Sequence, residues 1–206
     1  MSLALLDWRR RVTRLYAEVR GEPDVVAAHD HWRRTRDDLL RTHPESPVPE
    51  AQRAGYPGAP VAAYDPRLRF DVTLDTGVPA KQMDVSTGTD GTIRFDRIGC
   101  VHLPGGGELD VWWLGCYGGG IFVPVKDGSA GSATYGGGRY LIDTVKGADL
   151  GGDQGRLILD FNFAYNPSCA YDPAWSCPLA PAGNTLATPL LAGELMPAPG
   201  ASSRDR

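Results

Sequence analysis

The sequence predicts an α+β fold in which two N-terminal helices pack on a mainly antiparallel β-sandwich or partly closed β-barrel. Helical periodicity of apolar residues is confined to residues 1–43. After a proline-rich connection, about seven or eight short strand-like runs follow, each bounded by Gly, Asp or Pro. No alternation of strands and helices appears, which disfavours a parallel α/β sheet.

Two amphipathic helices are expected at the start of the chain. Apolar residues recur near helical spacing over 3–20, and Gly21 is a suitable C-terminal stop. A second helix is expected over 23–42, where Pro23 fits the first helical turn. The connection at 44–67 is rich in proline, so we expect it to cross the surface in extended conformation.

The β-rich core is expected over 68–196 and includes a long aromatic loop near its C-terminal end. Its strands are expected at 70–74, 93–95, 109–116, 121–125, 140–145 and 156–163. Trp112 and Trp113 are neighbours on one strand, so one ring should be buried while the other is covered by the helices or exposed toward a partner. We expect one domain over 1–196 and a flexible tail at 197–206.

The composition excludes several classes of protein. With 206 residues, 42% hydrophobic residues, 22% charged residues and a net charge of −4, the chain has the make-up of a soluble globular protein. Nucleic acid is not expected as a partner, because phosphate binding needs clustered Lys and Arg, and the N-terminal arginines interleave with acidic residues. No apolar stretch has the length of a membrane span, and no positive region precedes an apolar run at the start. We therefore expect a soluble cytoplasmic protein, with self-association left open.

Several motifs in the second half of the chain carry a family resemblance. They are T-Y-G-G-G-R-Y-L at 134–141, L-D-F-N-F-A-Y-N-P-S-C-A-Y at 159–171, S-C-P-L at 176–179, Asn184 and A-G-E at 192–194. With these motifs the chain resembles the DUF1684 family, a bacterial and archaeal domain of unknown function. Similar proteins usually carry a glutamate where this chain has Gly183, so a chemical role of that glutamate would be lost here. The resemblance implies no established activity.

The Y-G-G-G-R motif is the first candidate binding element. Its glycines allow positive φ and close backbone approach, and the arginine adds a planar donor fork. The motif would suit a loop around a carboxylate or phosphate, in which Arg139 holds an anionic group. It equally suits a glycine-rich hairpin whose arginine pairs with an internal carboxylate such as Asp160. No Lys-Ser/Thr follows it and it opens no helix, so it is neither a phosphate loop nor a dinucleotide fingerprint.

The D-F-N-F-A-Y-N-P segment supplies the second candidate element. Asp160 and Asn162 are two residues apart at a strand end, so they are expected on one face. They would form one wall of a small-ligand pocket opposite Arg139, where Asp160 orients that arginine or acts as a base. In the alternative interpretation the residues are structural: Asp160 and Asn162 form hydrogen bonds with backbone groups of a turn, while Asn166 and Tyr171 stabilise two turns of the chain. The candidate ligand-binding residues are Tyr135, Gly136, Gly137, Gly138, Arg139, Asp160, Asn162, Asn166 and Tyr171.

The four cysteines are expected to be free thiols. Cys169 and Cys177 have seven residues between them, which is too many for the usual zinc spacing, and no histidine follows them. A metal site would need Cys100 and Cys116 as well, so no metal is expected. Packing as small buried apolar groups is the favoured interpretation of these thiols.

The expected function is binding of a small anionic or polar ligand in a pocket between the two motifs. The alternative is a structural or protein-interaction module without catalytic activity, and a flavin-binding split barrel is a third hypothesis. The sequence assigns no cofactor and leaves open whether the chain is an enzyme.

Overall fold

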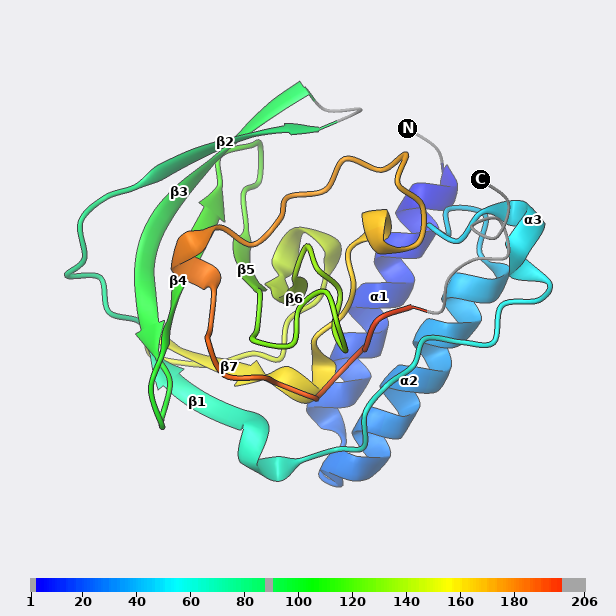
Figure 1. Cartoon of the computed structure of the whole chain (residues 1–206), viewed down its shortest axis with the longest axis horizontal. Helices are drawn as coiled ribbons and strands as arrows, with labels where there is room; N and C mark the ends of the chain where they lie inside the picture. The colour runs from blue at the N-terminus through cyan, green and yellow to red at the C-terminus, as the bar shows by residue number, and fades with distance from the viewer. Residues whose placement is uncertain (1–2, 88–90, 198–206) are drawn as a thin grey trace.

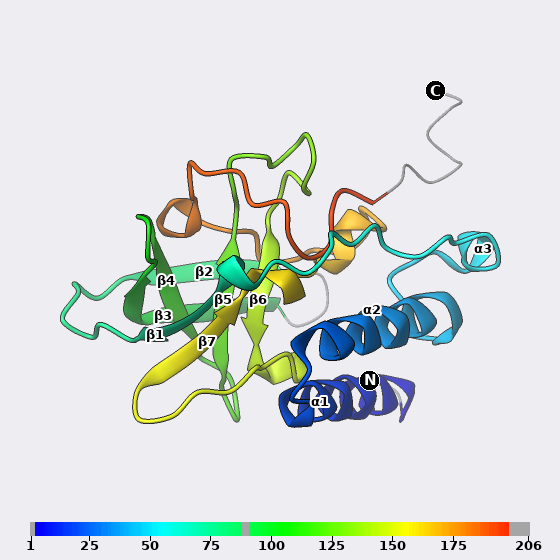
Figure 2. The same ribbon diagram turned by 90° about the horizontal axis from the view of Figure 1, so that it is seen from below.

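The computed structural model describes residues 3–87 and 91–197 and confirms the α+β class (Figure 1). Two long N-terminal helices lie side by side against a five-stranded antiparallel sheet, and a two-stranded sheet lies beside it (Figure 2). The sheets do not close into a barrel. Most of the tail expected at 197–206 falls outside the described residues.

The helices α1 (Leu3–Gly21) and α2 (Val25–Thr42) follow from amphipathic periodicity. Their buried residues are Val12, Leu15, Tyr16 and Val19 on α1, and Ala28, His29, Trp32, Leu39 and Leu40 on α2. The helix α2 begins later than predicted, because the Asp24 side chain caps it by accepting hydrogen bonds from two backbone N–H groups. A short helix, α3 (Glu50–Arg53), interrupts the proline-rich connection, which we predicted to be extended throughout.

The large sheet has the strand order β2-β3-β4-β5-β6, and every neighbouring pair is antiparallel. Its strands are β2 (Gln82–Thr87), β3 (Gly91–His102), β4 (Glu108–Leu114), β5 (Ile121–Val125) and β6 (Arg139–Asp143). The small sheet pairs β1 (Arg69–Thr73) with β7 (Arg156–Asp160). The strand predicted over 156–163 therefore ends at Asp160, and a 3-10 turn, Phe161–Phe163, follows it.

Alternate residues along the large sheet face two different hydrophobic clusters. Trp112, Phe122 and Tyr140 pack toward the helices, whereas their neighbours Val111 and Val123 pack toward the small sheet and the C-terminal segment. This period of two is what a sheet covered on both sides requires. The sheet is thus the middle layer, and the C-terminal segment closes the second cluster through Leu186, Leu190 and Ala192.

The two neighbouring tryptophans lie in different environments, as expected. Trp112 is 3% exposed, and its indole N–H donates to Asn184 Oδ1 at 2.9 Å. Trp113 is 41% exposed and covers Gly119, where an added Cβ would lie 2.5 Å from its ring.

Gly183, next to Asn184, has no room for a side chain either, since an added Cβ would collide with the Asp110 carboxylate.

Candidate functional site

Arg139 lies fully buried at the start of β6 and serves as an internal cross-link. Its Nη2 group donates to Asp127 Oδ2 at 2.9 Å and to the Leu190 carbonyl at 3.0 Å. The Nη1 group donates to the Ala192 carbonyl and, at 3.0 Å, to the Glu194 carbonyl. Three of the four Nη hydrogens thus tie β6 to the C-terminal segment and the fourth is bound by Asp127, so none of these four is free for the anionic ligand that we expected here. The buried Nε–H has no hydrogen-bond partner among the described residues.

The internal carboxylate beside Arg139 is Asp127, and the expected pairing with Asp160 is wrong. Asp127 lies just beyond the neighbouring strand β5, after Lys126, whereas Asp160 ends β7, a strand of the small sheet. The pKa of Arg139 is lowered by burial, which Asp127 partly offsets. The glycine before it has a packing role, because Gly138 has φ +87° and an added Cβ would lie 2.7 Å from the Val125 carbonyl oxygen.

Asp160 and Asn162 form a second buried network, at the junction of the small sheet and the segment that leads into it. Asp160 accepts hydrogen bonds from the Tyr64 hydroxyl at 3.1 Å and from Arg69 at 3.2 Å. It also accepts from the Asn162 amide side chain at 2.7 Å. Asn162 in turn pairs with the backbone of Asp65 through both ends of its amide, at 2.8 and 2.9 Å. The two side chains thus contact each other, although Asn162 lies in the 3-10 turn and not on the strand where we predicted it, and their partners are turn and strand groups of the chain itself.

The third network centres on Glu194, a fully buried carboxylate. Arg36 of α2 donates to both carboxylate oxygens, through Nε to Oε1 and through Nη2 to Oε2 at 3.2 Å. Oε2 also accepts from the Asn166 backbone N–H at 2.6 Å and from the Tyr171 hydroxyl at 3.0 Å. Burial alone would lower the pKa of Arg36, but the Glu194 carboxylate outweighs it and raises that pKa. Helix α2 is therefore joined to the C-terminal segment by a charge pair in the interior.

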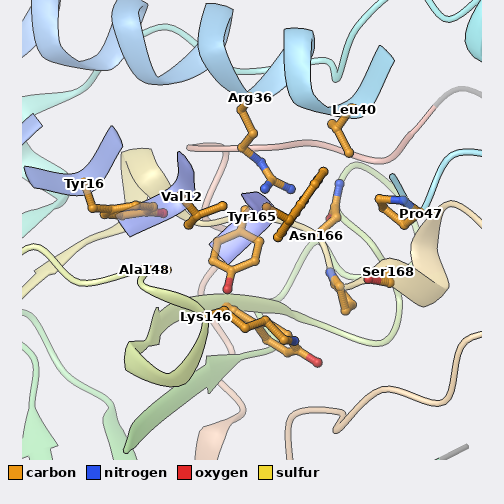
Figure 3. Close-up of a pocket in the computed structure, with 13 residues that line it drawn as sticks. Val12, Tyr16, Arg36, Leu40, Pro47, Lys146, Ala148, Tyr165, Asn166 and Ser168 are labelled. Atoms are coloured by element: carbon orange, nitrogen blue, oxygen red, sulfur yellow. The ribbon is translucent and has the colours of Figure 1, made fainter. Parts of the chain in front are cut away.

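A cavity of about 60 Å³ lies beside this third network, between the helices and the sheet (Figure 3). It is lined by Trp8, Val12, Tyr16, Arg36, Leu40, Pro47, Tyr140, Lys146, Ala148, Tyr165, Asn166, Pro167 and Ser168. The Arg36 guanidinium lies over the Tyr165 ring, 4.6 Å from its centroid. Lys146 lies beside the cavity with its side chain 47% exposed, and Asp143 Oδ2 is 3.3 Å from its ammonium.

Asn166 is the predicted site residue that lines this cavity. Its side-chain amide N–H donates to the Leu195 carbonyl at 2.9 Å, which fixes the orientation of the amide. The other end, Oδ1, is buried and has no hydrogen-bond partner among the residues that the structure describes. A buried acceptor without a donor is uncommon and costs about 1–3 kcal/mol, so this atom marks a place where a further donor would be favourable.

Cys169 and Cys177 lie together as half-buried free thiols, rather than as the buried groups that we predicted. The Cys169 backbone N–H donates to Cys177 Sγ at 3.4 Å, and the Tyr135 hydroxyl donates to Cys169 Sγ at 3.5 Å. A hydrogen bond from the Cys169 thiol, with the Cys169 N–H and the Lys146 charge, lowers the pKa of Cys177 to about 6. The same pairing raises the pKa of Cys169. Of the two thiols, Cys177 therefore ionises more readily.

Cys177 is expected to react with iodoacetamide at pH 7 faster than Cys169. An ordinary thiol becomes a thiolate near pH 8.5, whereas the Cys177 rate should reach half of its plateau near pH 6. Mass spectrometry of the alkylated peptides over pH 5–9 measures both rates, with exposed Cys116 as an internal reference. Equal rates for Cys169 and Cys177, or a midpoint above pH 8, would contradict the assignment.

The predicted site residues thus divide among three networks and do not converge on one pocket. Arg139 pairs with Asp127, Asp160 pairs with Asn162 and Arg69, and Asn166 shares Glu194 with Tyr171. Tyr135 contacts the thiol pair. Two residues central to the third network, Arg36 and Glu194, were not among the predicted ones. The A-G-E motif was the available signal for Glu194, but its carboxylate has no local partner to reveal its role.

The architecture defines an α+β protein with two N-terminal helices on an antiparallel sheet. Within that class, the chain belongs to the family described as "Protein of unknown function (DUF1684)", whose model matches residues 54–195. A similar fold is found in the solution NMR structure of an uncharacterized protein from gene locus rrnAC0354 of Haloarcula marismortui. The two chains are 30% identical, the match covers 79% of this chain and 89% of the other, and the TM-score is 0.55.

The comparison with curated proteins gave no match. The family match contains the floor of the cavity at 165–168 but neither of the long helices that cover it. Of the helices in the described part of the chain, none is long and apolar enough to span a bilayer. The cytoplasmic location stays a prediction.

Proposed function

We propose that this protein binds a small polar molecule in the cavity between the helices and the sheet, with Asn166 as the central contact. The observation that carries the proposal is the Asn166 Oδ1 atom, a buried acceptor without a partner at a cavity of about 60 Å³. A hydroxyl or amino group of a ligand would supply the missing donor. The binding site expected from the sequence is thereby moved from Arg139 to the far end of the D-F-N-F-A-Y-N-P segment.

The lining indicates the chemistry of such a ligand. Arg36 offers little net charge to it, because Glu194 already neutralises that guanidinium. Lys146, at the more exposed edge, retains ammonium hydrogens beyond its contact with Asp143 and suits a carboxylate. The Tyr140 and Tyr165 rings provide an apolar wall for the carbon atoms between the two polar groups. Small 2-hydroxy acids and 2-amino acids combine these features in a molecule of the right size.

The test uses a defined panel of probes: glycolate, lactate, glycine and serine, with acetate and ethanol as controls that each lack one polar group. Binding is followed by NMR through the Asn166 side-chain amide and the Trp8 indole N–H signals. Both signals should shift with the hydroxy or amino acids. Ala148→Leu, which fills the cavity, should weaken that binding at least tenfold while the remaining amide spectrum stays dispersed.

Lys146→Gln should weaken the binding of the carboxylate probes about threefold to tenfold and leave the response to ethanol unchanged. Lys81→Gln is the matched control, because Lys81 is similarly exposed and pairs with Asp110, away from the cavity. The proposal fails if no probe moves the Asn166 signal, or if Ala148→Leu and Ala148→Val bind every probe as tightly as the unaltered protein.

A further inference from the structure

A cysteine, a histidine and an aspartate meet at the corner where the small sheet joins the large one. Asp75 follows β1 and forms an antiparallel bridge with Cys100 of β3, with hydrogen bonds of 2.8 and 2.9 Å between their backbones. His102 is two residues beyond Cys100 on the same strand, so both side chains are on one face of the sheet. Gly99 permits the close approach, since an added Cβ would lie 2.6 Å from the Asp75 carbonyl oxygen. The backbone therefore fixes the three side chains beside one another.

The spacing of their donor atoms suits a single tetrahedral cation. His102 Nε2 is 3.6 Å from Asp75 Oδ2 and 3.7 Å from Cys100 Sγ, and the three donor atoms lie within 4.8 Å of one another. Zinc bonds of about 2.0–2.2 Å to nitrogen or oxygen and about 2.3 Å to sulfur, at tetrahedral angles, require edges of about 3.3–3.6 Å. The distances from His102 Nε2 to Asp75 Oδ2 and to Cys100 Sγ are already within a few tenths of an ångström of that range. Rotation of the Asp75 side chain, which is 48% exposed, adjusts the third distance, between the Asp75 carboxylate and Cys100 Sγ.

The second nitrogen of His102 faces a further carboxylate. Glu108, on the neighbouring strand β4, pairs across the ladder with His102, and its Oε2 is 3.5 Å from His102 Nδ1. Histidines that bind metals commonly donate their other N–H to a carboxylate in this way, which fixes the ring orientation and leaves Nε2 free for the metal. Without a metal, the carboxylates of Asp75 and Glu108 would be surface partners of the His102 ring, and Cys100 Sγ would make only a weak hydrogen bond with it.

We propose that Asp75, Cys100 and His102 bind one divalent cation of the zinc type, with Glu108 as the positioning residue for His102. Thiolate and imidazole donors favour such a cation over Mg²⁺ or Ca²⁺, which prefer oxygen ligands. Binding replaces the Cys100 thiol proton by a metal–sulfur bond and releases that proton to solvent. The exposed side of the cluster leaves a fourth position for water.

The experiment titrates tag-free, chelator-treated full-length protein with Co²⁺ and follows the thiolate-to-cobalt charge-transfer band and the visible bands of tetrahedral cobalt. One equivalent is expected to give both signals, and Zn²⁺ should displace it. His102→Gln replaces an exposed side chain, so the fold should persist while Co²⁺ affinity falls at least a hundredfold. Glu108→Gln should weaken binding about tenfold to a hundredfold.

The other thiols provide the matched controls. Cys116→Ser and a Cys169→Ser/Cys177→Ser double variant should keep the cobalt bands, whereas Cys100→Ser should lose the charge-transfer band. A band that survives in Cys100→Ser, or that disappears in the double variant, would place the metal elsewhere and overturn the proposal. Equal affinities of the unaltered protein and His102→Gln would show an ordinary histidine–carboxylate pair instead. No tetrahedral signal at millimolar Co²⁺ would also overturn it.

Discussion

Glu194→Ala is expected to lower the free energy of unfolding by about 3–5 kcal/mol, because it leaves the Arg36 guanidinium buried without its carboxylate. The variant also removes the acceptor of the Asn166 N–H and of the Tyr171 hydroxyl. Urea denaturation, followed by tryptophan fluorescence and circular dichroism, measures the loss.

A double-mutant cycle separates the charge pair from the other contacts of the carboxylate. Arg36→Met and Glu194→Gln should each destabilise by a similar amount, because each leaves one member of the pair without its partner. The double variant should recover part of the loss, since neither charge then remains in the interior. Tyr171→Phe removes a single hydrogen bond and should cost only about 0.5–1.5 kcal/mol. A cost below 1 kcal/mol for Glu194→Ala would show that water reaches Arg36 and that the pair is not a structural link.

Arg139→Met is expected to cost about 3–5 kcal/mol, for a related reason. It removes the guanidinium donors of three buried carbonyl oxygens and leaves the Asp127 carboxylate in the core without its cationic partner. Arg139→Lys keeps the charge but cannot reach four acceptors, so a smaller loss is expected. If instead Arg139→Met left stability unchanged and abolished the response to a carboxylate probe, the original anion-binding expectation for this residue would be restored.

The cost of Arg139→Met should depend on pH. Burial alone would raise the pKa of Asp127, but hydrogen bonds from Ser129 and the charge of Arg139 lower it below its ordinary value. A carboxyl group whose pKa is lower in the folded state contributes stability above its unfolded pKa, and this contribution is lost as the pH falls through the folded value. The difference between the unaltered protein and Arg139→Met should therefore shrink below about pH 4, near the ordinary aspartate pKa.

The sequence predicted those helices and strands that are marked by a pattern of neighbouring residues. Periodicity located α1, and alternation located most strands of the large sheet. The strand β2, Q-M-D-V-S-T, was missed although Met83 and Val85 alternate with exposed polar residues, because only these two apolar residues mark its inner face. Asp24 was overlooked as the cap of α2 in favour of the neighbouring proline.

The candidate site was less predictable, because its partners are set by long-range packing. Arg36 and Glu194 meet only after α2 docks on the C-terminal segment, and no spacing rule connects them. Asp75 likewise reaches Cys100 only through the bridge between two sheets. The sequence does contain a local signal for the proposed metal site, because Cys100 and His102 are two residues apart on one strand. This pattern was missed because His102 was considered only as a ligand together with Cys169 and Cys177, which are far from it in the sequence.

Gly183 and Asp110 are far apart in the chain but occupy one space. A side chain at position 183 would enter the volume of the Asp110 carboxylate, which Arg97 holds at 2.7 Å and Lys81 at 3.3 Å. Only one of the two positions can therefore carry an acidic group into this space. A side chain at position 183 and the Asp110 carboxylate in its present position are mutually exclusive in this backbone, so a substitution at one position changes what the other can hold.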